Sequence, residues 1–245
     1  MITLYAFGPN FGLPDASPFC MKVLVLLRMA GLDHTFKPCD LRKAPKGKGP
    51  YITDDGVTIA DSTFIRWHLE KKHGADFDAG LNARQRAEAW AFEKLCEDNL
   101  YWAVVSERWL IDENFNAGPR AFFNAVPAPM RPMVSAVVRR QIRRALHGQG
   151  LGRHSREERI EIARRGIDAL SDKLGENAFF MGDKPTSVDA IVFSTVAGYL
   201  PEVFQTELKA MVRRHDNLMA YHDRCMSKWF PKFSAASGSA ASGNA

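Results

Sequence analysis

Apolar positions follow two different patterns along the chain, and the amino-terminal part mixes strand and helix signals. Short runs rich in β-branched and aromatic residues predict four strands, at 2–7, 35–37, 50–53 and 57–60. Asp55-Gly56 between the last two is typical of a tight hairpin turn. We therefore expect the last two strands to pair in antiparallel fashion.

Two amphipathic helices are predicted among these strands. The first begins at Ser17-Pro18, a favoured cap followed by a favoured first helical residue, and ends at Gly31. The second runs from Asp61-Ser62 to about His73. The order β-α-β-β-β-α, with the first helix as crossover, makes the first two strands parallel. The chain is thus expected to begin with a mixed four-stranded α/β unit.

After a predicted linker at 75–82, the chain is expected to be entirely helical. The stretch 83–109 contains neither Gly nor Pro, and three prolines delay the next helix to about Met133. Further helices are expected at 155–175, which opens with a capping box, at 188–200, which has a similar cap, and within 206–230. Residues 234–245 lack side chains that could build a core, which predicts a flexible tail.

Composition and charge narrow the class of protein. The chain has 245 residues, of which 46% are hydrophobic and 25% charged, and a net charge of +5 spread along its length. These values are typical of soluble globular proteins and do not call for a nucleic acid partner. No apolar run approaches the ~18 residues of a membrane span, and the first residues lack a secretory pattern. We expect a cytoplasmic protein without an integral membrane segment.

The cysteines and histidines do not predict a metal site. Four cysteines, at 20, 39, 96 and 225, form no C-x-x-C pair, which argues against a zinc ribbon or a disulfide framework. The seven histidines lack the H-x-x-x-H spacing of a helical zinc site. His68 and His73 are five residues apart and are expected to diverge around their helix. No metal is therefore expected.

Four ordered segments resemble the glutathione S-transferase family: Ser17–Cys20, Lys48–Tyr51, Ala60–Ser62 and Gly182–Asp189. Longer runs, among them SPFCMK, APKGKGPYI, IADSTFIRWHLE and MGDKPTSVDA, are similar to the branch that includes failed-axon-connections proteins and metaxins. The resemblance spans about residues 2–231. It implies an α/β plus all-α architecture, with a thioredoxin-like domain at 1–74 followed by a helical domain at 83–231.

The resemblance implies a glutathione-binding site in the first domain. Asp61 would accept from the γ-glutamyl amine, and Ser62 at a helix start would bind a carboxylate. Lys48 and Gly49 precede Pro50, whose cis peptide would leave the Gly49 backbone free to pair with the bound peptide. Gly49 departs from the bulkier apolar residue common there. Taken alone, Asp61-Ser62 is equally typical of a plain helix cap.

Ser17 is the expected catalytic residue. A hydroxyl beside a helix start can donate to the glutathione thiolate and lower the pKa of the thiol, which would activate glutathione for attack. Two alternatives remain, since Ser17 is also a good N-cap and Tyr5 near the end of the first strand is a rival donor.

The expected second substrate is a hydrophobic small-molecule electrophile. In the resembled architecture the first long helix of the second domain faces the cleft, and it carries Tyr101, Trp102, Arg108 and Trp109. Together with Tyr5 and Phe7 these residues form the predicted substrate-binding set. Each of the four helical residues could instead belong to the core or to the homodimer contact that this fold usually forms.

Two other functions stay open. A non-catalytic binding or scaffold protein is one, because the metaxin-like branch contains members with assembly roles. A glutathione-dependent thiol oxidoreductase acting through Cys20 is the other, although we interpret Cys20 as semi-buried and structural. Arg139, Arg140, Arg143 and Arg144 form a basic helical face, interpreted as a solvated surface or as a contact for an anionic membrane or partner.

Overall fold

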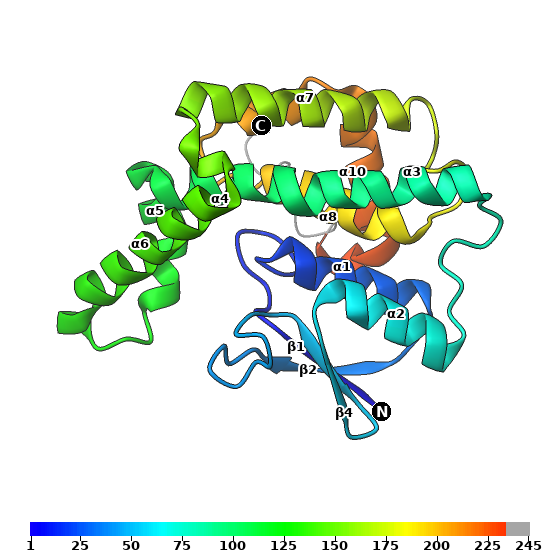
Figure 1. Ribbon diagram of the computed structural model, residues 1–245, viewed down its shortest axis with the longest axis horizontal. Helices are drawn as coiled ribbons and strands as arrows, with labels where there is room; N and C mark the ends of the chain where they lie inside the picture. Colours follow the sequence, from blue (N-terminus) through cyan, green and yellow to red (C-terminus); the bar gives the residue numbers. More distant parts are fainter. Residues whose placement is uncertain (234–245) are drawn as a thin grey trace, which may run out of the picture.

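A mixed four-stranded sheet forms the first part of the computed structural model, which describes residues 1–233 (Figure 1). The predicted tail, 234–245, lies outside the described residues. The strands are β1 (Ile2–Ala6), β2 (His34–Pro38), β3 (Tyr51–Asp54) and β4 (Val57–Ala60), in the order β2-β1-β3-β4. β1 and β2 are parallel, and the other neighbours are antiparallel. The predicted strands and their directions are confirmed.

Two helices, α1 (Pro18–Met29) and α2 (Ser62–His73), lie on one face of this sheet (Figure 1). In β1 the residues Ile2, Leu4 and Ala6 are buried beneath them, whereas the alternate residues are partly exposed. Ser17 caps α1, and Gly74 in the left-handed conformation ends α2, as the sequence predicts. The opposite face of the sheet is not covered by these helices.

The rest of the described chain is helical and stacks on α1 and α2 (Figure 1). Its elements are α3 (Ala83–Lys94), the π-helical segment η1 (Leu95–Leu100), α4 (Tyr101–Leu110), α5 (Asp112–Ala117), the 3-10 turns η2 (Pro119–Phe123) and η3 (Ala128–Met130), α6 (Arg131–Gln149), the 3-10 turn η4 (Leu151–Arg153), α7 (Arg156–Leu174), α8 (Ser187–Tyr199), α9 (Glu207–Arg213) and α10 (Asp216–Trp229).

Local sequence signals account for most of these boundaries. The capping boxes predicted at Ser155 and Thr186 are both present. A third, formed by Asn82 and Gln85, begins α3 and was not anticipated. Helix α6 begins at Arg131, slightly before the predicted Met133, because proline is tolerated in the first helical turn. The predicted continuous helix at 83–109 is interrupted by the π-helical turn of η1.

Helix α8 is the centre of the core. All of its residues are buried, and it packs against α1 as well as against α3 and α10. Its apolar character therefore reflects burial inside the protein. Within residues 1–233, no helix has both the length and the apolar composition that crossing a bilayer requires.

A buried ion cluster joins the sheet part to the helical part. Lys22 on α1 is fully buried, and its Nζ lies 2.9 Å from Glu93 Oε1 on α3 and 2.6 Å from Glu97 Oε1 on η1. Both carboxylates are themselves buried. An ammonium removed from water is tolerable only when its partners stay in place. The cluster therefore fixes α1 against the first helices of the second part.

A second cation extends this cluster to the linker and to α8. Arg66 on α2 lies 3.1 Å from Glu93 Oε2 and also pairs with the buried carboxylate of Asp78 in the linker. The other oxygen of Asp78 accepts from the backbone N–H of Ser187, at 3.0 Å. The start of α8 is thus tied to both α2 and α3 through charged groups.

We predict that Lys22→Met lowers the free energy of unfolding by about 3–5 kcal/mol, because two buried carboxylates lose their shared cation. Urea denaturation followed by tryptophan fluorescence measures this change. The exposed Lys71→Met variant on α2 is the matched control and should change stability by less than about 0.5 kcal/mol. A loss below 1 kcal/mol in Lys22→Met would contradict the proposed role of the cluster.

Candidate functional site

Three chain segments converge at one end of the sheet. Helix α1 starts beyond the carboxyl end of β1, where Tyr5 pairs with Tyr51 at the beginning of β3. Strand β4 ends at the same level, since Ala60 also pairs with Tyr51. The loops that carry Ser17, Pro50 and Asp61 therefore meet at this end, on the side of the molecule toward which β1 runs and on which α5 and α6 lie (Figure 1).

Lys48, Pro50 and Asp61 are in direct contact at this end. The Gly49–Pro50 peptide is cis, as the family resemblance implied. The carbonyl oxygen of Pro50 accepts from the backbone N–H of Asp61 at 3.2 Å. Lys48 Nζ lies 3.4 Å from Asp61 Oδ2. The structure thus brings together the loop before β3 and the start of α2.

Asp61 holds an unusual backbone conformation. Its φ of 87° lies in the region that favours glycine; such strain costs about 1–3 kcal/mol and persists only where the surrounding structure imposes it. Its Oδ1 accepts from the backbone N–H of Thr63 at 3.1 Å, so Asp61 is also a helix cap. Ser62 in the first turn is buried. Strained residues of this kind are concentrated at ligand-binding sites.

Close packing explains the glycine before the cis proline. A Cβ placed on Gly49 would lie 3.1 Å from Cys39 Sγ and 3.4 Å from the ring of Phe7. These two side chains occupy the space that a bulkier residue would need. Phe7 itself is exposed beside Gly49, and Cys39 is a half-buried free thiol.

Ser17 stands at the start of α1 with its backbone held by a buried carboxylate. Its N–H donates to Asp15 Oδ1 at 2.8 Å, and the N–H of Gly8 donates to Asp15 Oδ2 at 2.6 Å. The Ser17 hydroxyl accepts a long bond of 3.5 Å from the Cys20 N–H and stays partly exposed. The cap and the placement at the site are therefore compatible roles for Ser17.

Asp15 is a residue that the sequence analysis missed. It is fully buried, and burial raises its pKa to about 6 although backbone N–H donors act in the opposite direction. The available signal was its position two residues before the helix cap, where aspartate commonly accepts from the backbone. Asp15 closes the loop between β1 and α1 and so orients Ser17.

Cys20 is buried directly behind Ser17. Burial raises the pKa of its thiol well above the ordinary value, and the neighbouring Asp15 charge acts in the same direction. A thiol in this environment is protonated at neutral pH and is a poor nucleophile. The interpretation of Cys20 as a structural residue agrees with these properties.

Tyr101, one of the predicted substrate residues, contacts the start of α1. Its ring packs edge-on against Phe19 with 4.8 Å between centroids, and Phe19 belongs to the first turn of α1. Burial raises the pKa of Tyr101, so its hydroxyl stays protonated. Trp102 packs against Tyr101 and the core. The two residues thus lie at the junction between α1 and α4.

Arg108 and Trp109 have different surroundings from those expected. The Arg108 guanidinium is buried, donates to the carbonyl of Gly198 and lies 4.6 Å from the centroid of Phe204. Burial lowers its pKa to about 10. Arg108 therefore ties α4 to α8 and does not form part of an open wall. Trp109 packs instead against Phe115 beside α6.

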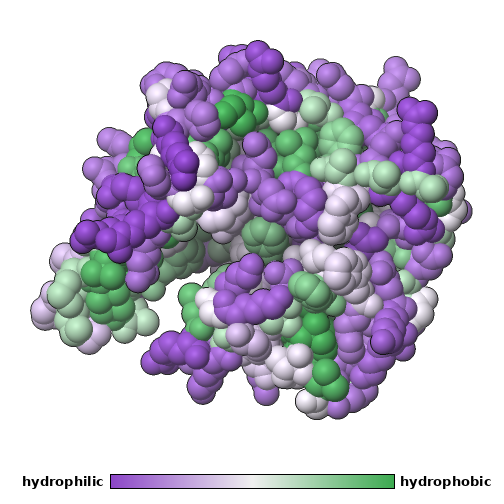
Figure 2. All heavy atoms as spheres, viewed as in Figure 1, coloured by the Kyte–Doolittle hydropathy of each residue, from purple (hydrophilic) through white to green (hydrophobic). Residues whose placement is uncertain are grey.

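An aromatic residue in the loop after β1, Phe11, reaches the helical part and was not predicted. Its ring lies 5.6 Å from that of Phe122 and 5.0 Å from that of Phe204. The backbone φ of Phe11 is 56°, an uncommon conformation for a residue other than glycine. Figure 2 shows an indentation between the sheet part and the arm formed by α5 and α6. Phe11 and Phe122 supply apolar surface between these parts.

Two predicted positions need correction. Tyr5 stacks on Tyr51 at 4.2 Å on the sheet face opposite α1, because residues of β1 alternate between faces. It therefore does not point toward Ser17. Arg139 is not part of a solvated basic face, since it donates to the carbonyl of Trp109 and pairs with Asp112. Arg140, Arg143 and Arg144 are exposed.

The expectation that His68 and His73 diverge is wrong. The Nε2 atoms of both rings lie 2.8 Å from Asp54 Oδ2, at the end of the sheet opposite Ser17. Asp54 ends β3 directly beside the last turns of α2, so that each long imidazole side chain reaches the same carboxylate. The spacing of His68 and His73 along their helix gives no information about Asp54, which lies on β3.

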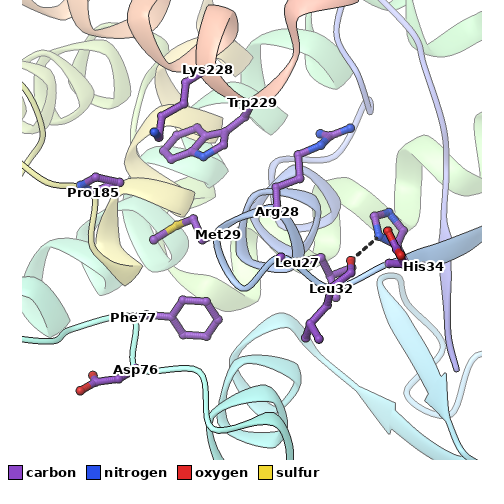
Figure 3. Close-up of a pocket in the computed structure, with 12 residues that line it drawn as sticks. Leu27, Arg28, Met29, Leu32, His34, Asp76, Phe77, Pro185, Lys228 and Trp229 are labelled. Carbon is purple, nitrogen blue, oxygen red and sulfur yellow. Dashed lines mark hydrogen bonds between the residues drawn. The ribbon is translucent and has the colours of Figure 1, made fainter.

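A cavity of about 780 Å³ lies away from the predicted site (Figure 3). It is lined by the carboxyl end of α1, including Arg28 and Met29, by Phe77 of the linker and by Lys228 and Trp229 of α10. Ser17 is at the opposite end of α1. None of the predicted site residues lines this cavity.

Two protein-family models match segments of this chain. The model described as the glutathione S-transferase N-terminal domain matches residues 18–114, and that of the C-terminal domain matches residues 163–225. The isoprene-epoxide–glutathione S-transferase of Rhodococcus sp. (strain AD45) is 36% identical over 94% of this chain and 99% of its own length.

Other relatives carry different names. Metaxin-1 of Mus musculus is 31% identical over 94% of this chain and 75% of its own length. Failed axon connections of Drosophila melanogaster is 30% identical over 94% of this chain, which spans 58% of that relative. Among solved structures, the beta-etherase LigF from Sphingobium sp. strain SYK-6 has 18% identity and a TM-score of 0.61, over 94% of this chain and 99% of that one. At 18% identity, the similarity to this beta-etherase shows a shared fold alone.

We predict that Asp15 makes stability fall as pH rises from about 4 to above 6. Its folded-state pKa of about 6 exceeds the ordinary 3.8, so the folded protein binds the Asp15 proton more tightly than the unfolded chain does. This stabilisation is lost once Asp15 is ionised in both the folded and the unfolded state. The full effect is about 3 kcal/mol at 1.36 kcal/mol per pKa unit. Urea denaturation of wild type and Asp15→Asn across this range measures it. A stability difference between the two that does not vary with pH would contradict the prediction.

Proposed function

Because this chain belongs to the glutathione S-transferase family, we propose that it binds reduced glutathione and transfers it to a small apolar electrophile. The observation that carries the proposal is the convergence of the α1 start, cis-Pro50 and strained Asp61 at one end of the sheet. We infer that residues 1–74 form the glutathione-binding domain and that 83–231 form the helical domain that supplies the second substrate site.

Glutathione would be held by the contacts between the Pro50 loop and the start of α2. The N-terminus of α2 attracts a carboxylate through its free N–H groups and its dipole, and Ser62 lies in that first turn. The Asp61 carboxylate would accept from the γ-glutamyl amine. The exposed Lys48 ammonium would pair with the peptide's other carboxylate, while the Gly49 backbone, free of a side chain, would pair with the peptide itself.

Ser17 would stabilise the glutathione thiolate. Its hydroxyl accepts a long bond from the Cys20 N–H and is partly exposed, so its O–H can donate to the sulfur of a bound glutathione. Donation to the charged form, together with the α1 dipole, lowers the pKa of the thiol and raises the nucleophilic fraction at neutral pH. Asp15 would act as a positioning residue through the Ser17 N–H.

An epoxide is the electrophile that the comparisons favour. The name of the Rhodococcus relative at 36% identity specifies an isoprene epoxide. In such a reaction the thiolate attacks one ring carbon, the carbon–oxygen bond breaks and the oxygen takes a proton from water. Tyr101, Phe11 and Phe122 offer aromatic surface near the junction of the two parts, which suits an apolar substrate.

A thiol oxidoreductase function through Cys20 is disfavoured by burial. The thiol is completely inaccessible, and its pKa is raised well above the ordinary value. A mixed disulfide with glutathione would require the start of α1 to open. The scaffold alternative has support only from the relatives named metaxin-1 and failed axon connections, and the binding experiment below separates it from the transferase.

We also propose that the protein is a homodimer whose contact includes α2. Phe64 and Trp67 are exposed large aromatic residues on one face of this helix, with ring centroids 5.1 Å apart. Aromatic residues grouped on a surface are typical of protein–protein contacts. A second copy of the chain would remove both rings from water.

We predict that calorimetric titration with reduced glutathione shows binding that Asp61→Ala weakens at least tenfold, about 1.4 kcal/mol, through loss of the amine acceptor. Ser17→Ala should bind within about threefold of wild type. It should, however, raise the pKa of the bound thiol and lower kcat with an epoxide by about 10²-fold. Ultraviolet absorbance of the thiolate and product formation measure these two effects.

Asp33→Ala, on the exposed loop after α1, is the matched control and should leave all three quantities unchanged. Absence of glutathione binding at millimolar concentration, in calorimetry and in thermal shift, would refute the transferase and favour the scaffold. Binding with no turnover of epoxides or of a general aryl halide would leave a glutathione-binding protein without the catalytic step.

We predict that Phe64→Ser combined with Trp67→Ser converts the dimer into a monomer, because both exposed rings lose their contact. Light scattering coupled to size exclusion measures the mass. Met133→Ser, which changes another exposed apolar residue on α6, should leave the dimer intact. A monomeric wild-type protein, or a dimer that survives the double substitution, would refute this contact.

A further inference from the structure

Two histidines and one aspartate gather at the end of the sheet opposite the glutathione site. Asp54 is the last residue of β3, and His68 and His73 lie in the second half of α2. At 1.5 Å per residue, His68 and His73 lie roughly 10 and 18 Å along the helix axis from Asp61 at the helix start. The cluster plays no part in the proposed transferase chemistry.

The donor atoms of the three side chains point at a common centre. One nitrogen of each imidazole and one oxygen of Asp54 all lie within 4.8 Å of one another. Both Nε2 atoms are 2.8 Å from Asp54 Oδ2. Both rings are partly exposed, so the centre can be reached from solvent.

Asp54 provides an independent sign that the cluster lacks a ligand. Its side chain is 1% exposed, and its second oxygen, Oδ1, is buried without a hydrogen-bond partner among the described residues. A buried carboxylate oxygen left unpaired is costly, and a cation beside it removes that cost. The N-terminal amine is 3.9 Å from this oxygen, too far for a hydrogen bond.

We propose that Asp54, His68 and His73 form a binding site for Zn²⁺. Two imidazole nitrogens and one carboxylate oxygen are a donor set that zinc accepts, with a fourth position left for water. Bonds of about 2.0–2.1 Å place tetrahedral donors roughly 3.3 Å apart, so small side-chain rotations close the observed arrangement around an ion. Zinc then joins the end of β3 to the last turns of α2.

Lys72 is the cation that zinc would have to displace. Its Nζ lies 3.0 Å from Asp54 Oδ2, and it also lies 2.7 Å from Asp55 Oδ2. Lys72 can therefore keep its ion pair with Asp55 while the metal binds the Asp54 carboxylate. The N-terminal amine also contacts Asp55. Zinc thus competes with the Lys72 ammonium for the Asp54 carboxylate.

The test is a zinc titration of the untagged, chelator-treated 245-residue protein against a chromophoric competitor, with Co²⁺ absorption as a second readout. We expect one ion per chain, a higher Tm with zinc, and a cobalt spectrum of nitrogen and oxygen ligands without thiolate bands. His68→Ala and His73→Ala should each weaken binding at least tenfold. Lys72→Met should tighten it, because the competing charge is gone.

His215→Ala is the matched control. His215 also contacts an aspartate, with Nε2 3.1 Å from Asp168 Oδ1, but this pair contains a single histidine. This variant should leave zinc affinity unchanged, as should Cys39→Ser. The proposal is overturned if zinc does not bind at micromolar concentration, if binding survives both histidine substitutions, or if Lys72→Met binds no more tightly than wild type. Glutathione affinity should be the same with and without zinc, so failure of either proposal leaves the other testable.

Discussion

The buried ammonium of Lys22, held between Glu93 and Glu97, sets how the sheet part sits on the helices. Its charge cannot be solvated where it lies, so any shift of α1 relative to α3 would leave an uncompensated ion in the core. Arg66 and Asp78 extend this network of buried charges to α2, the linker and the start of α8. Ser17 caps α1, and Tyr101 begins α4 directly after η1, so the cluster also limits how these two residues are placed relative to each other.

The loop between β1 and α1 combines two tasks that the proposed reaction requires. Asp15 holds its backbone at Gly8 and Ser17, and the same loop extends Phe11 across the junction to Phe122. The residue expected to stabilise the thiolate and a residue expected to line the electrophile site are therefore parts of one short segment. A buried carboxylate whose charged form is disfavoured provides its anchor.

Helix α2 has opposite electrostatic character at its two ends. Its start, with Asp61 and Ser62, presents free N–H groups that favour an anion such as a peptide carboxylate. Its last turns carry His68 and His73 beside a buried carboxylate, where the helix dipole favours a cation. The two proposed ligands thus use the polarity of the same element, at ends too far apart for direct contact.

Local signals in the sequence determined the strands, the helix starts at Ser17, Ser155 and Thr186, and the segments of the resembled family, because caps, turns and periodicity depend on neighbouring residues. The alternation of buried and partly exposed residues along β1 also determines that Tyr5 faces away from α1. Only the tertiary structure decided the burial of Arg108, the role of Asp15, the reach of Phe11 and the meeting of His68 and His73 at Asp54. Each of these depends on contacts between segments distant in the chain, whose approach is set by packing and by buried charge and not by local spacing.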